Sequence, residues 1–426
     1  MEQSSRWVIS GLALATGLWV MLPALAQGGR VDAEEREAAA QAQAQSTNID
    51  AQTGQTLNEA IELMNADDYA GAALKISTLQ LDRLSPYERG RVEQILTNIA
   101  VEQEKYEEAR EHLQKAIDSG GLNAVEIDQA RYQHAVLYIQ EDKWREGAAA
   151  LEEWFKTATN ANSAAYYLLA AAYYQLEDLA RALPPAKKAV ELMDPAKPNE
   201  SWLGMLLALH LQREEYREAI PVLEQLITAA PDKKLYWTQL SQVYVQIEDY
   251  ANGLAVMQLA NLAGLVTEDS EVRRLADLLV FNGVPYRCGQ VLEAGIEKKL
   301  VTLDEKLYEK LSNCWIAAGE LDKSVAPLER AAELAPSGDT FVRLGELQGQ
   351  RDDWPAAIAA IQRGVDKGQL KDPGNAQLWL GIAHYSQKNY EAAVPFFERA
   401  RQSDKHRAMA DNYLQAIRAQ SRKIFD

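Results

Sequence analysis

The sequence has few of the residues that most often build metal sites. It contains two cysteines and five histidines among 426 residues. The histidines stand far apart, and none has a partner at the short spacing typical of zinc ligands; they are His112, His134, His210, His384 and His406. Amphipathic side chains of this kind most often belong to a core. The sequence therefore predicts no metal site and no cofactor.

Positive charge is also in deficit. The chain has 44 Lys and Arg against 62 Asp and Glu, which gives a net charge of −18 and a pI near 4.9. Binding to nucleic acid or to an anionic membrane surface needs a basic footprint, so the composition argues against both functions. The acidity is interpreted as a contribution to solubility.

Long apolar runs are absent except at the N-terminus. After the polar segment "MEQSSR" comes "WVISGLALATGLWVMLPALA", which ends in the small-residue site Ala24-Leu25-Ala26. This pattern predicts a cleaved signal peptide over residues 1–26, although twenty apolar residues can also serve as an uncleaved anchor. No later segment is apolar enough to span a membrane. We therefore expect an exported protein, with the bacterial periplasm as its location.

Motifs of catalysis are missing as well. The sequence contains no HExxH, no GxGxxG, no phosphate-binding loop and no GxSxG. Its many carboxylates are scattered as solvated charge along predicted helix faces. The chain is therefore predicted not to be an enzyme.

What the sequence does contain is a repeat. A turn-like "EDY" pattern recurs ten times at spacings of 33 to 38 residues, each time with a small residue three positions after its last, anchor position. The anchors are Tyr69, Tyr106, Trp144, Leu179, Tyr216, Tyr250, Pro285, Leu321, Trp354 and Tyr390. The small residues are Ala72, Ala109, Gly147, Ala182, Ala219, Gly253, Cys288, Ser324, Ala357 and Ala393. This period is typical of a helical repeat array.

Each unit is predicted to be two amphipathic helices joined by a polar turn. The small residues indicate where the helices of a pair approach closely. Pro184, Pro221 and Pro395 stand five positions after their anchors, which predicts that those second helices start late or bend. A single pair cannot bury its apolar face, so neighbouring pairs must stack.

The repeats resemble the tetratricopeptide repeat family. The resemblance is carried by "AYYLLAAAYYQLEDLARALPPAKKAV", "LYWTQLSQVYVQIEDYANGLAVMQLA" and "AQLWLGIAHYSQKNYEAAVPFFERA". It implies an all-α solenoid of about ten helix-turn-helix repeats wound into a right-handed superhelix, over residues 56–401. A flexible acidic, Ala- and Gln-rich leader is expected over 27–55. A capping helix is expected over 402–426, with Met409, Tyr413, Leu414 and Ile417 on one face.

A narrower resemblance links the chain to exported tetratricopeptide proteins that are accessory components of TonB systems. It is carried by "NESWLGMLLALHLQREEYREAIPVLEQLITAAPDKKLYWTQLSQVY", "GVPYRCGQVLEAGIEKKLV" and "DKGQLKDPGNAQLWLGIAHYSQKNYEAAVPFFERA". It implies a periplasmic adaptor whose partners are protein subunits of a TonB-dependent uptake system. The alternative is a cell-envelope factor that binds peptidoglycan or a secreted polysaccharide.

Stacked repeats present a groove lined by the first helix of each pair, suited to a peptide. Side chains at helical spacing on these first helices are the candidate protein-binding residues: Tyr132, Tyr167, Tyr174, Gln175, Thr238, Gln242 and Gln246. Aromatic rings offer rigid contact area, and amides pair with a peptide backbone. The same residues also suit an ordinary repeat surface.

The two cysteines, Cys288 and Cys314, leave two alternatives open. In an oxidising compartment they can form a disulfide that stabilises the fold by about 3 kcal/mol. Alternatively they are buried separately, which their location at helix positions that need small residues slightly favours.

Overall fold

The computed structural model describes residues 48–159 and 161–425. Within them the chain is helical and contains no strand; one short 3₁₀ segment, η1, covers Leu81–Arg83. The chain divides into two compact units, the first ending at Ala229 and the second beginning at Ala230. The predicted signal peptide, 1–26, and most of the predicted leader lie outside the described residues.

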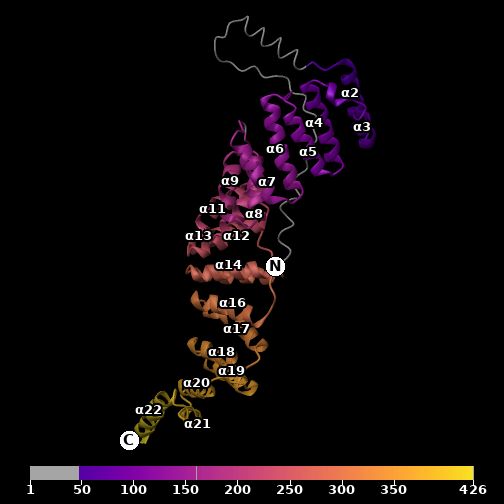
Figure 1. The fold of residues 1–426 in the computed structure, drawn as a ribbon. Coiled ribbons are helices and arrows are strands. Elements are labelled where there is room, and N and C mark those ends of the chain that lie inside the picture. Colours follow the sequence, from indigo (N-terminus) through magenta and orange to yellow (C-terminus); the bar gives the residue numbers. More distant parts are fainter. Residues whose placement is uncertain (1–47, 160, 426) are drawn as a thin grey trace. The chain divides into compact units, whose positions relative to one another are not determined.

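Each unit consists of successive helix pairs (Figure 1). The helices of the first unit are α2 (Ala51–Asn65), α3 (Tyr69–Ile76), α4 (Pro86–Glu102), α5 (Tyr106–Asp118), α6 (Ala124–Gln140), α7 (Trp144–Phe155), α8 (Ser163–Gln175), α9 (Leu179–Glu191), α10 (Glu200–Gln212) and α11 (Tyr216–Ala229). Those of the second are α12 (Lys234–Gln246), α13 (Tyr250–Leu262), α14 (Asp269–Phe281), α15 (Pro285–Glu297), α16 (Glu305–Ala317), α17 (Leu321–Leu334), α18 (Asp339–Gln350), α19 (Trp354–Lys367), α20 (Pro373–Ser386), α21 (Tyr390–Ala400) and α22 (Arg407–Phe425).

The even-numbered first helix of each pair packs on the odd-numbered second helix that follows it. Within a unit, that second helix also packs on the first helix of the next pair. All ten second helices, α3 to α21, begin at the ten predicted anchors. The predicted all-α repeat solenoid of ten helix pairs is therefore confirmed within the two units.

Small residues stand where the two helices of a pair cross. All ten positions three residues after the anchors are buried, as predicted. In the α12–α13 pair, a Cβ atom on Gly253 would lie 3.2 Å from the carbonyl oxygen of Ser241. The hydroxyl of Ser241 donates a hydrogen bond of 2.8 Å to the carbonyl of Gly253. The pair α16–α17 repeats this bond between Ser312 and Ser324, at 3.0 Å.

The turn inside each pair has a left-handed residue two positions before the anchor. In eight turns this residue is charged, with φ between 56° and 61°: Asp67, Glu104, Asp142, Glu177, Glu214, Glu248, Asp352 and Lys388. In the other two it is Gly283 or Gly319. In five pairs the residue just before the anchor caps the second helix, because its side chain accepts a hydrogen bond from a backbone N–H group of that helix. These N-cap residues are Asp68, Asp178, Asp249, Asp353 and Asn389. In the "EDY" pattern, the first residue therefore adopts the left-handed conformation, the second is the N-cap and the third is the first residue of the helix.

The prolines do not delay their helices. The helices α9, α11 and α21 begin at their anchors and run through Pro184, Pro221 and Pro395. The expected late start is therefore wrong. Each proline forgoes one backbone hydrogen bond inside a helix that the packing of neighbouring helices still defines.

The ends of the array differ in detail from the prediction. Helix α2 begins at Ala51, five residues before the predicted start of the array, because the carboxylate of Asp50 accepts hydrogen bonds from the N–H groups of Gln52 and Thr53. At the other end α22 packs on α21 and buries Leu414 and Ile417. Met409, expected on the same face, is 51% exposed, and Ala410 is buried instead.

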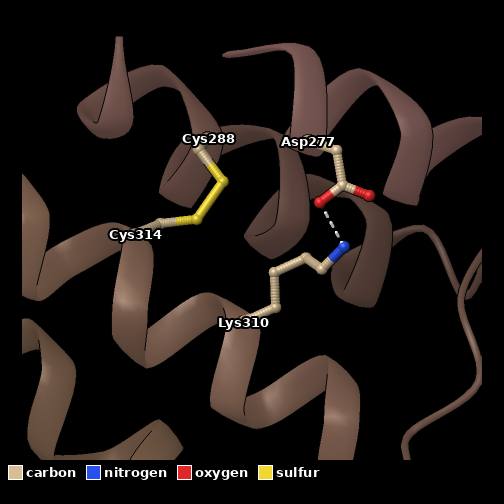
Figure 2. Close-up of a disulfide and its surroundings, with 4 residues drawn as sticks. All are labelled: Asp277, Cys288, Lys310 and Cys314. Carbon is tan, nitrogen blue, oxygen red and sulfur yellow. Dashed lines mark hydrogen bonds and ion pairs between the residues drawn. A yellow bond between two sulfur atoms is a disulfide. The ribbon is translucent and has the colours of Figure 1, made fainter. Parts of the chain in front are cut away.

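The two cysteines are joined by a disulfide. Cys288 lies on α15 and Cys314 on α16, with Cα atoms 5.7 Å apart, and both are buried (Figure 2). The sequence slightly favours two separately buried cysteines, and that preference is wrong. The packing of α15 on α16 brings the two Cα atoms within the range of a disulfide. It links the second helix of one pair to the first helix of the next.

Candidate functional site

In the first unit, two of the candidate groove tyrosines are held by neighbouring rings. Tyr132, on α6, is half-buried with its ring 4.9 Å from that of Trp154, and burial raises its pKa. Tyr167, on α8, is only 8% exposed and its ring lies 5.9 Å from that of Trp202 in the next pair. Burial raises the pKa of Tyr167 too. Tyr167 is thus a packing residue, and its assignment to an open groove is corrected.

The other two candidates of this unit lie at the end of α8. Tyr174 and Gln175 are both half-buried. The hydroxyl of Tyr174 accepts a hydrogen bond of 2.9 Å from the side-chain amide of Gln212 on α10. This bond joins the first helices of two consecutive pairs, so Tyr174 contributes to stacking and keeps only part of its ring for a partner.

In the second unit, the three remaining candidates share one face of α12. Thr238, Gln242 and Gln246 follow one another at four-residue spacing, which places them on one side of the helix. Thr238 is half-buried and donates a hydrogen bond of 2.9 Å to the carbonyl of Leu235. Gln242 and Gln246 are exposed, and neither has a hydrogen-bond partner within residues 48–159 and 161–425. These two amides are the exposed members of the predicted set of seven.

The first helices of the second unit are also linked to one another by polar pairs. They are Lys234 with Glu271 at 3.2 Å, Arg273 with Asp304 at 3.2 Å, Lys310 with Asp277, Arg343 with Asn313, and Asn375 with Glu346 at 2.6 Å. Each pair joins the first helix of one repeat to that of the next. From the sequence these charges are expected to be solvated. The paired residues are 29 to 37 positions apart, close to the repeat period, and this spacing is the sequence pattern that could have predicted the pairs.

Three of the histidines are paired with carboxylates. His112 contacts Glu93 at 2.6 Å, His210 contacts Glu215 at 2.8 Å, and His406 contacts Asp372 at 3.0 Å. The two others are partly buried, and burial lowers the pKa of both His134 and His384. In the part of the chain that the structure describes, no three His, Cys, Asp or Glu residues gather in a metal-binding arrangement. In the same residues no helix combines the length and apolar character that a membrane crossing requires.

Comparison with known families agrees with this architecture. Two stretches, residues 132–200 and 342–408, match the family model described as tetratricopeptide repeat. These two stretches carry tetratricopeptide repeats. The first matched stretch lies in the first unit and the second in the second unit, and they include the pairs α8–α9 and α20–α21. No curated protein matches the chain.

Several solved structures are similar at low identity. A repeat protein from Parabacteroides merdae ATCC 43184 is 13% identical and has a TM-score of 0.30, covering 63% of this chain and 98% of its own. The domain of yeast Sti1 in a complex named for pHSP90 is 14% identical with a TM-score of 0.30, covering 61% and 96%. PilW, a type IV pilus biogenesis factor, is 12% identical with a TM-score of 0.32, covering 49% and 97%. At these values the likenesses carry no argument about the partners of the present repeats.

Proposed function

We propose that this chain is a periplasmic scaffold that binds protein partners, as an accessory component of a TonB-type energy-transduction system. The observation that carries the scaffold role is the array of ten tetratricopeptide-type helix pairs, because stacked repeats present long binding surfaces relative to their core. The TonB assignment rests on the sequence resemblance of residues 199–244, 283–301 and 366–400.

Two further features support an exported protein. The first 26 residues have the composition of a signal peptide, with Ala24 and Ala26 at its small-residue site. The second unit contains a buried disulfide between Cys288 and Cys314. Structural disulfides persist mainly in oxidising compartments such as the bacterial periplasm.

The partner-binding role is assigned to the exposed face of α12. Gln242 and Gln246 offer amide donors and acceptors at a spacing that suits the backbone of a bound peptide. The neighbouring charges Lys234 and Glu271 are engaged with each other across two repeats. The helix that carries the two amides is therefore linked to the first helix of the next repeat by this ion pair.

The test is recovery of partners from the native cell envelope. The full chain carries a C-terminal tag, is expressed at its natural level and is cross-linked in living cells before purification. We expect TonB or its inner-membrane energiser subunits to be enriched at least tenfold over an untagged strain. Cell fractionation of the same strain should place the mature chain in the periplasmic fraction.

A matched pair of variants separates the groove face from the rest of the surface. Gln242→Arg introduces a longer, positively charged side chain on α12, and Gln225→Arg makes the same change at an exposed position of α11. Gln242→Arg should reduce recovery of the partner several-fold, whereas Gln225→Arg should leave it unchanged. Absence of every TonB-system subunit, or enrichment of peptidoglycan fragments in their place, would overturn the TonB assignment.

A further inference from the structure

A hollow of about 320 Å³ lies in the second unit, between the end of α13, the segment that follows it, and α15. Five of its lining residues form one stripe along α15, at helical spacings of three and four: Arg287, Gln290, Val291, Ala294 and Lys298. Near the middle of this stripe the lining residues Ala294 and Gly295 have small side chains, which leave room for the hollow. Val266, in the segment after α13, and Val272, on α14, add apolar surface.

Both ends of the stripe carry a positive charge. Arg287 and Lys298 are exposed, and within the described residues neither has an ion-pair or hydrogen-bond partner. No aspartate or glutamate lines the hollow. On a chain with a net charge of −18, this is a local reversal of sign. It favours an anionic partner over a cationic one.

The separation of the two cations indicates an elongated partner. They are eleven residues apart on one helical face, which corresponds to about 16 Å along the axis at 1.5 Å per residue. An extended peptide covers that distance with about five residues. A single small anion cannot contact both ends.

Exposed apolar side chains stand on α13, the helix whose end lines the hollow. From Tyr250 to Thr267 the chain has no charged residue. On α13, Leu259 is 54% exposed and Leu262 is 82% exposed. Leu262 follows directly on Asn261, which lines the hollow. A partner laid along α15 can therefore bury apolar side chains on α13 while its carboxylates meet the two cations.

We propose that α13 and α15 form a docking surface for an extended acidic segment of a partner protein, in which carboxylates alternate with apolar side chains. The surface is separate from the amides of α12, and it does not depend on the identity of the partners proposed above. It gives the scaffold a second attachment point, selective for acidic sequence.

The experiment uses the purified full chain and a blocked seven-residue peptide of alternating aspartate and leucine, labelled for fluorescence anisotropy. A peptide of alternating lysine and leucine is the matched probe. We expect the aspartate peptide to bind at 50 mM NaCl, to bind at least tenfold more weakly at 500 mM NaCl because salt screens exposed charges, and to outcompete the lysine peptide at both concentrations.

Two charge-reversal variants locate the site. Arg287→Glu/Lys298→Glu should weaken binding of the aspartate peptide by about tenfold or more. Arg274→Glu/Lys306→Glu makes the same change in net charge at exposed positions outside the hollow, and should alter binding by less than twofold. Leu262→Ala should weaken it by about threefold through lost apolar contact. Equal binding of the two peptides, or equal losses in the two double variants, would overturn the proposal.

Discussion

Cys288 and Cys314 hold two consecutive repeats together from positions 26 residues apart in the sequence. Their disulfide joins α15 to α16, and the ion pair between Asp277 and Lys310 joins α14 to α16 nearby (Figure 2). Both helices of one pair are therefore fastened to the first helix of the next by side-chain bonds in addition to apolar packing.

Removing the disulfide should destabilise this part of the second unit. For the variant Cys288→Ala/Cys314→Ala we expect a loss of about 3 kcal/mol, because the open loop regains conformational entropy in the unfolded chain. Urea unfolding measures the loss, and hydrogen exchange should show it concentrated in residues 285–317. A reducing agent should lower the stability of the wild type and leave the variant unchanged; equal responses of the two would contradict the prediction.

Glycine substitutions should have opposite effects in a turn and in a helix. Gly319 has a φ of 75° and open space where a Cβ atom would stand, so Gly319→Ala should destabilise by about 1 kcal/mol through backbone strain alone. Gly204 lies inside α10, also in open space, and Gly204→Ala should stabilise by up to about 1 kcal/mol. Thermal melting of the two variants gives the signs directly. If both variants were destabilised by a similar amount, the backbone angle φ would not explain the effect of the substitution.

Alanine variants of the buried and the exposed groove candidates should differ in their free energy of unfolding. Tyr167→Ala removes a side chain packed on Trp202 and should cost about 3 kcal/mol. Gln242→Ala changes an exposed amide and should cost less than about 0.5 kcal/mol. Urea unfolding with binding measured in parallel checks this. If Tyr167→Ala lost binding while keeping wild-type stability, its place among the packing residues would be wrong.

The junction of α20 and α22 should be sensitive to acid. Hydrogen bonds from Lys405 at 2.7 Å and from His406 at 3.0 Å hold the pKa of Asp372 at about 2, below its ordinary 3.8. Because the folded-state pKa is lowered, the stabilisation is complete above the unfolded pKa near 3.9 and is lost as pH falls from about 4 toward 2. Solvent screening of this partly exposed carboxylate reduces its contribution to about 1 kcal/mol.

The variant Asp372→Ala tests that dependence. At pH 7 it should be less stable than the wild type, since the N-cap of α20 and both partners are lost. The difference in the free energy of unfolding should shrink as the pH falls from about 4 toward 2, and chemical denaturation at each pH measures it. A difference that stays constant over this range would exclude the carboxylate as its source.

The positions within a helix pair were predictable from the sequence. The ten anchors coincide with the starts of the second helices, and the small residue three positions later is buried in every pair. Both follow from the contact between the two helices of one repeat, which recurs at the repeat period. The left-handed turn residue was not predicted, because eight of its ten examples are charged residues and only two are glycine.

The faces between repeats were harder to predict. The helical spacing places Tyr167 in an open groove, yet its ring packs on Trp202, 35 positions later in the next pair. Whether a first-helix side chain is exposed depends on how adjacent pairs stack, and that angle is not encoded in the pattern of a single repeat. The hollow along α15 is equally invisible in the sequence, since its shape depends on Val266 and Val272 as well as on the helix.

The disulfide has a mechanical consequence. A repeat array drawn out from its ends yields pair by pair, because each pair is held mainly by its neighbours. Cys288 and Cys314 are 26 positions apart, and the segment between them cannot lengthen while the bond is intact, which withholds about 90 Å of contour length at 3.3–3.6 Å per residue. That segment therefore limits how far the array can extend before a covalent bond must break.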